Sequence, residues 1–340
     1  MARFKVGTFN VLNLALPGQK TYPNDEPYSE KEYRKKIDWI GGQLQRMNAD
    51  VIGFQEVWHE QALTAAVQAG RLEGKTHKVI VASQSDSSPQ VALATSLEIV
   101  RTVAHGNFPE GFELSVSDVP GPIKAFSRPV LQADLKLADG QEVTVLVAHL
   151  KSKRPMVEQG QSADARNLAL GSARSLIVRA AEAYALRCIL LSLLQDTQHP
   201  VILLGDLNDS ATAVTTTIIS GSPPLHHLHP EKKQKIWDVL LYNAFDIQAR
   251  QNTHRDVSYS HIYNGFYDTL DQIYVSQEFS RLNPRRLGEV EYVHYFNDHL
   301  VDRTLSRDDE RQRIYSDHGQ VVATLRLRQP RPQSQPQPEE

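Results

Sequence analysis

The sequence predicts an α/β fold in which two β-sheets pack together and helices cover them. The first observation is a series of short, mostly apolar segments, which alternate along the chain with turn residues. The second is that helical patterns stand between these segments, the longest at 163–196. Two packed sheets under helices accommodate such a set of strands, because each sheet must bury its apolar faces. No glycine-rich loop follows the first strand, which argues against a dinucleotide-binding domain.

The first elements follow from local patterns. Phe4–Phe9 is a predicted strand. Ser29-Glu30-Lys31-Glu32 has the pattern of a capping box, in which serine and glutamate side chains satisfy free backbone N–H groups at a helix start. Apolar side chains then recur every three or four residues, which gives the helix one apolar face. These are Tyr33, Ile37, Ile40, Leu44 and Met47. Val51–Phe54 is the next predicted strand and leads into Gln55-Glu56.

The later elements are predicted in the same way. Val130–Leu137 and Val143–Ala148 flank Asp139-Gly140, which is a strong hairpin signal. The helix at 163–196 is rich in Ala, Leu and Arg, and we expect its arginines at 166, 174, 179 and 187 on the surface. Further strands are predicted at 79–82, 91–95, 97–103, Val201–Leu204, Leu270–Val275 and Gln320–Leu327.

The composition indicates one large globular domain with an unstructured end. The chain has 340 residues, of which 40% are hydrophobic and 23% are charged. We expect residues 1–327 to form the domain. Residues 328–340 are rich in Pro and Gln and nearly free of apolar side chains, so this tail is predicted to be disordered.

Charge and cysteine content exclude some classes of protein. The formal net charge is −3, which argues against binding nucleic acid through bulk charge and leaves a local basic groove open. Cys188 is the single cysteine, so neither an intrachain disulfide nor a thiolate metal cluster can form. The N-terminus has the pattern of a strand rather than of a signal peptide, and no run of about 20 apolar residues predicts a membrane span. We therefore expect a cytoplasmic protein.

Polar residues of one kind stand at the ends of the predicted strands. Strand ends are places where a rigid sheet can present side chains to a common cleft. One polar strand end is unremarkable, but this chain repeats the feature with carboxylate, amide and imidazole groups throughout. The residues are Asn10, Glu56, His149, Asp206, Asn208, Asp271, Asp317 and His318.

These residue types suit chemistry on phosphate esters. Carboxylate and amide oxygens without cysteine favour hard cations, so we expect Mg²⁺ or Mn²⁺ rather than structural zinc. Mg²⁺ keeps several waters and binds through one or two carboxylates together with substrate phosphate oxygens. Histidines beside such an ion can transfer protons or bind developing negative charge. The set therefore predicts attack of water on phosphorus.

Six short motifs resemble the endonuclease/exonuclease/phosphatase superfamily, to which pancreatic deoxyribonuclease, apurinic endonucleases and sphingomyelinases belong. They occur in the order found in that family and span residues 7 to 321. The resemblance implies a four-layered α/β sandwich, with two mostly antiparallel sheets flanked by helices. The motifs are GTFN at 7–10, FQEV at 54–57, HLKSK at 149–153, GDLND at 205–209, LDQIYVS at 270–276 and SDHGQV at 316–321.

The resemblance also implies roles for the polar residues. Glu56 matches the principal metal ligand, and Asn10 and Asp317 complete or support the metal site. Asp206 orients or deprotonates the attacking water, and Asn208 helps to place it. His149 and His318 contact the scissile phosphate, with Asp271 orienting His318. Whether Asp206 or His318 is the general base stays open.

The substrate-binding residues are predicted from the bacterial nuclease branch of the superfamily. HLKSKRP places Lys151, Lys153 and Arg154 after the first histidine, and Arg128 lies in a similar arginine-proline turn. A nucleic acid, with DNA favoured over RNA by a small margin, is therefore the expected substrate. Arg281, Arg285 and Arg286 are further candidates for contacts with its backbone. A phosphatase or a phospholipid or sugar phosphoesterase is the alternative, and a catalytically silent binding module is the third. Endo- or exonuclease action and any protein partner stay open.

Overall fold

The computed structural model describes residues 2–71, 75–83, 88–112, 114–115, 122–158, 160, 162, 164–251, 257–304 and 309–328. The predicted tail lies outside the described residues except for Arg328, and its disorder stays a prediction. The strands are β1 (Ala2–Leu14), β2 (Val51–Val57), β3 (Lys78–Val81), β4 (Gln90–Thr95), β5 (Glu98–Asn107), β6 (Ala125–Lys136), β7 (Glu142–His149), β8 (Val201–Asp206), β9 (Leu241–Asn243), β10 (His261–Tyr263), β11 (Phe266–Asp268), β12 (Asp271–Ser276), β13 (Gly288–Phe296) and β14 (Gln320–Leu327). The helices are α1 (Glu30–Met47), α2 (Glu60–Ala69), α3 (Ala165–Leu194), α4 (Val214–Ser220), α5 (Pro230–Asp238), α6 (Ala244–Ala249), the short 3₁₀ helix η1 (Gln277–Phe279) and α7 (Asp309–Ile314).

Most described strands belong to two six-stranded sheets, ordered β13-β14-β1-β2-β4-β3 and β5-β6-β7-β8-β12-β9. Each sheet contains one parallel pair, β1 with β2 and β7 with β8, and its other pairs are antiparallel. Strands β10 and β11 form a separate hairpin. The predicted mostly antiparallel sheets are therefore confirmed.

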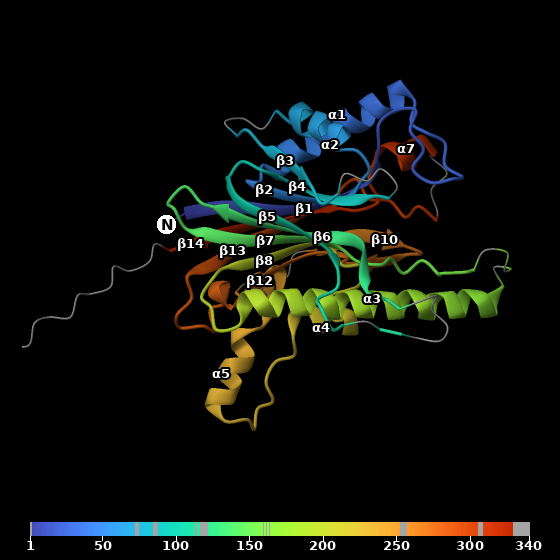
Figure 1. Ribbon diagram of the computed structural model, residues 1–340. Helices are drawn as coiled ribbons and strands as arrows, with labels where there is room; N and C mark the ends of the chain where they lie inside the picture. The colour runs from blue at the N-terminus through green and yellow to red at the C-terminus, as the bar shows by residue number, and fades with distance from the viewer. Residues whose placement is uncertain are drawn as a thin grey trace, which may run out of the picture.

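The two sheets pack face to face, and helices cover their outer faces (Figure 1). Apolar side chains of α1 and α2 pack on β1, β2 and β4, and those of α3 and α4 pack on β6, β7 and β8. The long crossovers through α1 and α3 are what the two parallel pairs require, because parallel neighbours cannot be joined by a tight turn. The four-layered α/β sandwich predicted from the sequence is confirmed.

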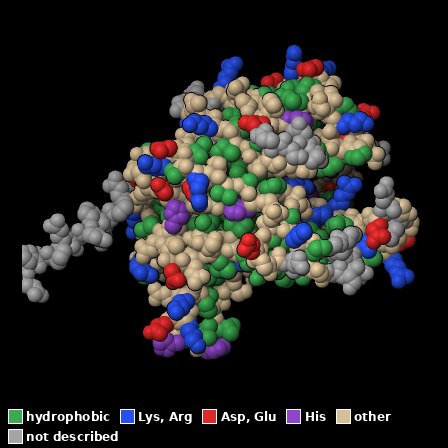
Figure 2. All heavy atoms as spheres, in the orientation of Figure 1, with side chains coloured by type: hydrophobic (Ala, Val, Ile, Leu, Met, Phe, Trp, Pro, Cys, Tyr) green, Lys and Arg blue, Asp and Glu red, His purple; other side chains and the backbone are tan. Residues whose placement is uncertain are grey.

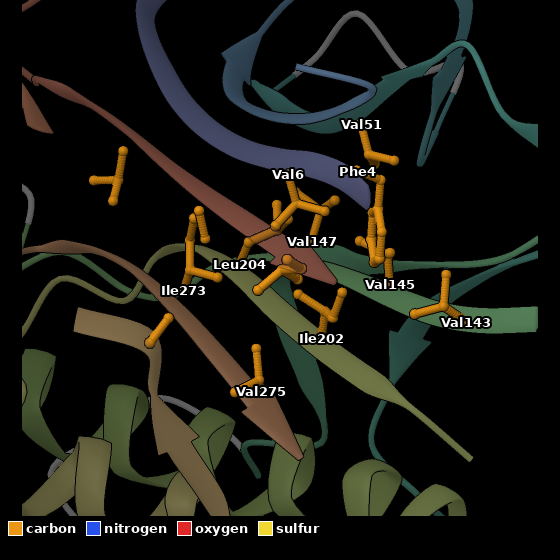
Figure 3. Packing of buried hydrophobic residues seen from close by; sticks show 14 of the residues in the cluster. Phe4, Val6, Val51, Val143, Val145, Val147, Ile202, Leu204, Ile273 and Val275 are labelled. Carbon is orange, nitrogen blue, oxygen red and sulfur yellow. The ribbon is translucent and has the colours of Figure 1, made fainter. Parts of the chain in front are cut away.

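Alternation along the strands builds the core between the sheets. Val145 and Val147 point from β7 toward the other sheet, whereas Leu146 and Ala148 between them pack against α3. Figure 3 shows Val147, Leu204 and Ile273 of the second sheet close to Val6 of the first. This buried layer fixes how the strand ends of the two sheets face each other.

Two local predictions are confirmed and several elements were missed. Ser29 caps α1 with both hydrogen bonds of the capping box, and β6 and β7 form the predicted hairpin. Strand β13 was missed, because an irregularity between Val290 and Tyr292 breaks the two-residue alternation of its buried side chains. The hairpin of β10 and β11 was also missed, because its short strands remain exposed.

The surface and the helices agree with the composition. Lys and Arg side chains lie interspersed with Asp and Glu over the face shown in Figure 2, as the small net charge suggests. Within the described part of the chain, no helix has both the length and the apolar character that crossing a membrane requires.

The packing between the sheets predicts the effect of a methyl group at Gly53. A Cβ atom there would collide with the Leu204 side chain and lie 2.9 Å from Val147 Cγ1. We expect Gly53→Ala to lower the free energy of unfolding by about 1–3 kcal/mol in a urea titration, because overpacking displaces core side chains. Gly42→Ala is the control, since nothing lies within 4 Å of its Cβ position. Equal stability of the Gly53→Ala variant and the unsubstituted protein would contradict this account.

Candidate active site

The strand ends of both sheets meet at one edge of the sandwich. Asn10 lies on β1 and Glu56 on β2, near the ends of the parallel pair of the first sheet. His149 and Asp206 end the parallel pair of the second sheet and are partners in its register. Asp271 begins β12 directly opposite Asp206. Sequence separation of up to 308 residues, from Asn10 to His318, thus becomes proximity in space.

Asp206 is the centre of this arrangement. It is 1% exposed, and its Oδ2 atom accepts a hydrogen bond from Asn10 Nδ2 at 3.1 Å. The same oxygen lies 3.5 Å from His149 Nε2 and 3.8 Å from His318 Nε2. Its other oxygen accepts the Asn208 backbone N–H at 2.8 Å. The preceding Gly205 has φ +147, and a Cβ there would run into the carbonyl of Ala148, so only glycine fits the turn that aims Asp206.

Glu56 reaches the same edge through an irregularity in β2. The pairing of β2 shifts register between Phe54 and Val57, and Glu56 itself has φ +64, which is uncommon for a residue with a side chain. Its carboxylate accepts hydrogen bonds from Asn10 Nδ2 at 3.3 Å and from the Asn13 backbone N–H at 3.0 Å. The amide of Asn10 therefore bridges a carboxylate of each sheet.

Asp271 and His318 form a tight pair beside Asp206. His318 Nδ1 lies 2.7 Å from Asp271 Oδ2, and both side chains are buried. Ser316 Oγ holds the segment in place, since it accepts the His318 backbone N–H and donates to the Asn10 carbonyl. Burial alone would lower the pKa of His318, but the Asp271 and Asp206 carboxylates raise it well above its usual value. His318 therefore carries a proton near neutral pH.

The pKa values of Asp206 and His149 are also shifted away from those of the free side chains. Burial raises the pKa of Asp206, the His318 cation lowers it and the Asp271 carboxylate raises it, and the net pKa is about 7. Burial also lowers the pKa of His149, and the cations Arg128 and His318 act in the same direction. The site therefore holds a neutral imidazole, an imidazolium and a carboxylate that titrates near neutral pH.

Asp317 lies at the more open side of the site. Its side chain is 23% exposed, and Arg303 Nη1 lies 3.4 Å from Oδ2. Its Oδ1 atom is buried and has no hydrogen-bond partner among the described residues. Burial would raise the pKa of Asp317, but His318 and Arg303 hold it below its usual value. An ionised oxygen without a donor is suited to a cation.

Arg128 and Lys151 form the basic side of the site. Both act electrostatically on His149, and the Arg128 Nε atom is buried without a hydrogen-bond partner among the described residues. Burial lowers the pKa of Lys151, and the Arg128 cation lowers it further. Cations that crowd each other in this way favour an anion between them.

The remaining predicted basic residues differ in position. Lys153 Nζ lies 3.6 Å from Asp209 Oδ1 and 3.4 Å from Asp268 Oδ2, so it links the HLKSK loop to β11. Arg154 is exposed on the same loop. Arg281, Arg285 and Arg286 follow the far end of β12, about 20 Å along the strand from Asp271. Only a substrate that extends well beyond the scissile bond could contact both places, so the suggestion that they bind its backbone stays a prediction.

Two buried side chains of helix α3 form hydrogen bonds with the backbone of the basic side. Glu182 is 1% exposed, and its two oxygens accept the backbone N–H groups of Ser127 at 2.7 Å and of Lys151 at 2.6 Å. Arg179 donates to the Lys151 carbonyl at 3.2 Å and to Asp209 Oδ2 at 3.0 Å. The expectation that the arginines of this helix lie on the surface is wrong for Arg174 and Arg179, which are buried.

Lys36 is a buried residue near the site that was not predicted from the sequence. It is fully buried on α1, donates to the Arg313 carbonyl at 3.2 Å, and is influenced by the Asp317 and Glu56 carboxylates. Burial and the Arg303 cation lower the pKa of Lys36 to about 7. A signal was present, because Lys36 stands three residues after Tyr33 and four before Ile40, on the apolar face of the helix. Both carboxylates thus act electrostatically on one buried amine.

Asp206, Asp271 and His318 are close enough to hold a metal ion, with one ligand atom from each within 4.8 Å of the others. The 2.7 Å contact between Asp271 and His318 is instead that of a charge-assisted hydrogen bond, which a proton occupies. These side chains are also nearly inaccessible, whereas a hydrated ion needs an open side. Glu56 and Asp317 are more accessible and suit a cation better.

A family model described as Endonuclease/Exonuclease/phosphatase family matches residues 7–318. A search of curated proteins found no match. The matched range contains all the predicted catalytic and metal-binding residues.

Solved structures of the same fold resemble this chain at low sequence identity. An endonuclease/exonuclease/phosphatase from Bacteroides vulgatus has TM-score 0.57 and 13% identity, with 96% of this chain and 100% of that chain covered. TDP2 from D. rerio, complexed with a single-strand DNA product, has TM-score 0.52 and 12% identity over 96% of this chain and 99% of that one. A mannosyl-6-phosphatase from Bacteroides thetaiotaomicron has TM-score 0.54 and 14% identity over 95% and 100%. At such identities these likenesses show the fold alone.

The two backbone contacts of Glu182 predict that it positions the basic side of the site. Glu182→Gln keeps the shape but turns an amide NH₂ toward one of the two N–H donors. We expect kcat/KM for a phosphodiester substrate to fall roughly tenfold, because an unsatisfied buried donor costs about 1–3 kcal/mol. Glu98→Gln, an exposed residue of β5, is the control. A folded Glu182→Gln variant with unchanged kcat/KM would rule out this role.

Proposed function

Because this chain belongs to the Endonuclease/Exonuclease/phosphatase family, we propose that it is a metal-dependent phosphodiesterase that hydrolyses nucleic acid. One observation carries the proposal. A buried carboxylate with a pKa of about 7, Asp206, faces a protonated histidine, His318, across 3.8 Å at the edge where the sheets meet. A carboxylate whose pKa is raised toward neutral pH is suited to the role of a general base.

Glu56, Asn10 and Asp317 are the residues that would hold a divalent cation. Their donor set is carboxylate and amide oxygen, which favours Mg²⁺ or Mn²⁺. The unpartnered Oδ1 of Asp317 and the partial exposure of Glu56 fit such an ion. A bound cation would neutralise charge on the phosphate oxygens and so favour the approach of a nucleophile.

The side chains around Asp206 account for the movement of protons. A water attacks phosphorus and its proton passes to Asp206. The bond from phosphorus to the ester oxygen breaks, and the departing oxygen takes up a proton from solvent. Asn208 and Asn10 fix the carboxylate by hydrogen bonds to its two oxygens. We assign Asp206 rather than His318 as the general base, because His318 is already protonated and held by Asp271. His318 and His149 then bind the phosphate oxygens as negative charge develops.

The basic side of the site favours a diester within a longer anion. Arg128 and Lys151 lie beside His149, and Lys153 and Arg154 continue along the same loop. A polymer of phosphates can contact all four, whereas one small phosphate cannot. The solved structures include both a complex with single-strand DNA product and a sugar phosphatase, so the family alone does not choose between these substrates.

A sugar phosphatase is the second candidate. It is favoured by a polar cleft of about 390 Å³ that Asn13, Asn24 and Arg303 help to line. The backbone N–H of Asn13 donates to Glu56, which connects this cleft with the site. Hydroxyl groups of a sugar could bind there. A panel of single- and double-stranded DNA, RNA and hexose 6-phosphates with Mg²⁺ separates the candidates. Hydrolysis of the hexose phosphates alone would replace the nuclease proposal.

The proposed general base predicts a large kinetic effect. Asp206→Asn keeps the side-chain shape but removes the group that takes the proton. We expect kcat to fall by about 10²–10⁴-fold, which is the usual contribution of general base catalysis. Asp38→Asn, exposed on α1, is the matched control and should retain full activity. A loss of less than about threefold in the Asp206→Asn variant would mean that another group takes the proton.

The proposed cation ligands predict metal binding that can be measured without substrate. Titration calorimetry with Mn²⁺ should show binding to the unsubstituted protein, and Glu56→Gln should weaken it by about 10–100-fold, as removal of supporting groups at metal sites does. EDTA should abolish cleavage. Glu98→Gln is again the control. Cleavage that persists in EDTA, or equal Mn²⁺ affinity in the Glu56→Gln variant, would refute the metal assignment.

A further inference from the structure

The hairpin of β10 and β11 carries aromatic side chains to the edge of the site. Its turn at Asn264-Gly265 has positive φ at both residues, +48 and +76, which is the geometry of a tight two-residue hairpin. Tyr263 and Phe266 are 58% and 73% exposed. Large aromatic rings exposed together are unusual on a protein surface that has no binding role. In Figure 1 the hairpin lies at the end of the sandwich opposite the start of β1.

One face of the hairpin is aligned with the catalytic histidine. The register pairs His261 with Asp268 and Tyr263 with Phe266, so these four side chains point to the same face. His261 forms a backbone bridge with His318, and the two rings lie 5.0 Å apart. The Tyr263 ring stacks on that of His261 at 6.4 Å and 20°. A row of rings therefore begins at His318 and leads away from the scissile position.

The hairpin is fixed at its base and at its tip. Gly319 donates its backbone N–H to the Ser260 carbonyl at 2.7 Å, and Asp268 faces Lys153 at 3.4 Å. At the turn, the Gly265 N–H donates to Asp302 Oδ2 at 2.6 Å. A surface held at several points loses little conformational entropy when a ligand stacks on it.

The chemistry of this face favours a flat, uncharged ring. Burial lowers the pKa of His261 to about 4, and the His318 cation acts in the same direction, so the His261 ring is neutral near neutral pH. A nucleobase presents a flat π-face to such rings, whereas sugar hydroxyls would find few polar partners beside Tyr263 and Phe266. In a duplex the base faces are covered by neighbouring bases, so only an unpaired base can stack here.

We propose that His261, Tyr263 and Phe266 form a stacking platform for an unpaired nucleobase next to the scissile phosphate, which makes single-stranded nucleic acid the preferred substrate. This inference rests on the proposed nuclease function. The platform begins one ring from His318, so the base that it holds belongs to a nucleotide adjacent to the cleaved bond. Lys153 at its base then lies near a neighbouring phosphate.

The test uses single-stranded DNA and RNA decamers in which each nucleotide in turn is replaced by an abasic residue. Cleavage at each phosphodiester is resolved on a gel. With the unsubstituted protein and Mg²⁺, we expect one abasic position beside the cleaved bond to lower kcat/KM roughly tenfold, which corresponds to one base–aromatic stack. The double variant Tyr263→Ala/Phe266→Ala should lose roughly tenfold on intact decamers and be insensitive to that abasic residue.

The control is Trp237→Ala, which removes an aromatic ring that is 43% exposed on α5, far from the hairpin in Figure 1. It should cleave intact and abasic decamers as the unsubstituted protein does. Comparison of kcat/KM between the DNA decamers and the RNA decamers shows which of the two nucleic acids is preferred. If abasic residues slow the double variant as much as the unsubstituted protein, the platform is disproved while the nuclease function stands. If only duplexes of the same sequences are cleaved, the preference for single strands is wrong while the nuclease function stands. If neither the decamers nor the duplexes are cleaved, the proposed function itself fails.

Discussion

The hydrogen bond from Asn10 Nδ2 to Asp206 Oδ2 is the contact on which the site depends. It joins the two sheets at 3.1 Å in a place where both side chains are buried, and the same amide also reaches Glu56. A carboxylate buried at 1% exposure is costly unless donors surround it, so the position of Asp206 depends on this amide and on the N–H of Asn208. The core between the sheets supplies the other half of the constraint, because it sets how the two edges face each other.

Each sheet contributes to the site through the same device. A parallel pair with a helical crossover brings two strand ends together, β1 with β2 through α1 and β7 with β8 through α3. An antiparallel neighbour then begins at that edge and adds residues from its start: Asp317 and His318 before β14, and Asp271 on β12. The helices of the crossovers also send buried charges inward, Lys36 from α1 and Glu182 from α3. The proposed acid–base groups, the proposed cation ligands and their supports thus follow from one topology.

Site residues could be predicted from the sequence where their neighbours in the chain form a recognisable pattern. Asn10, His149 and Asp206 follow apolar strands, and this pattern is visible without coordinates. Lys36 and Glu182 were harder to find, because each is a charge within a helix whose partners lie more than 30 residues away in sequence. Charges in helices are usually solvated, so the place of Lys36 on the apolar face of its helix is a weak signal. The aromatic hairpin was missed for a different reason. Its Asn264-Gly265 turn is a hairpin signal, but its strands are only three residues long, and their importance comes from a bridge to His318.

The most direct measurement of the shared site is a double-mutant cycle on kcat/KM across the contact between the sheets. Asn10→Ala, Asp206→Ala and the double variant are compared with the unsubstituted protein on one phosphodiester, with melting temperatures confirming that all are folded. Residues that act as a unit are strongly non-additive. The account predicts a double variant no slower than the slower single variant. If the fold-losses in kcat/KM of the two single variants instead multiply in the double variant, the two sheets contribute independently and the central claim is wrong.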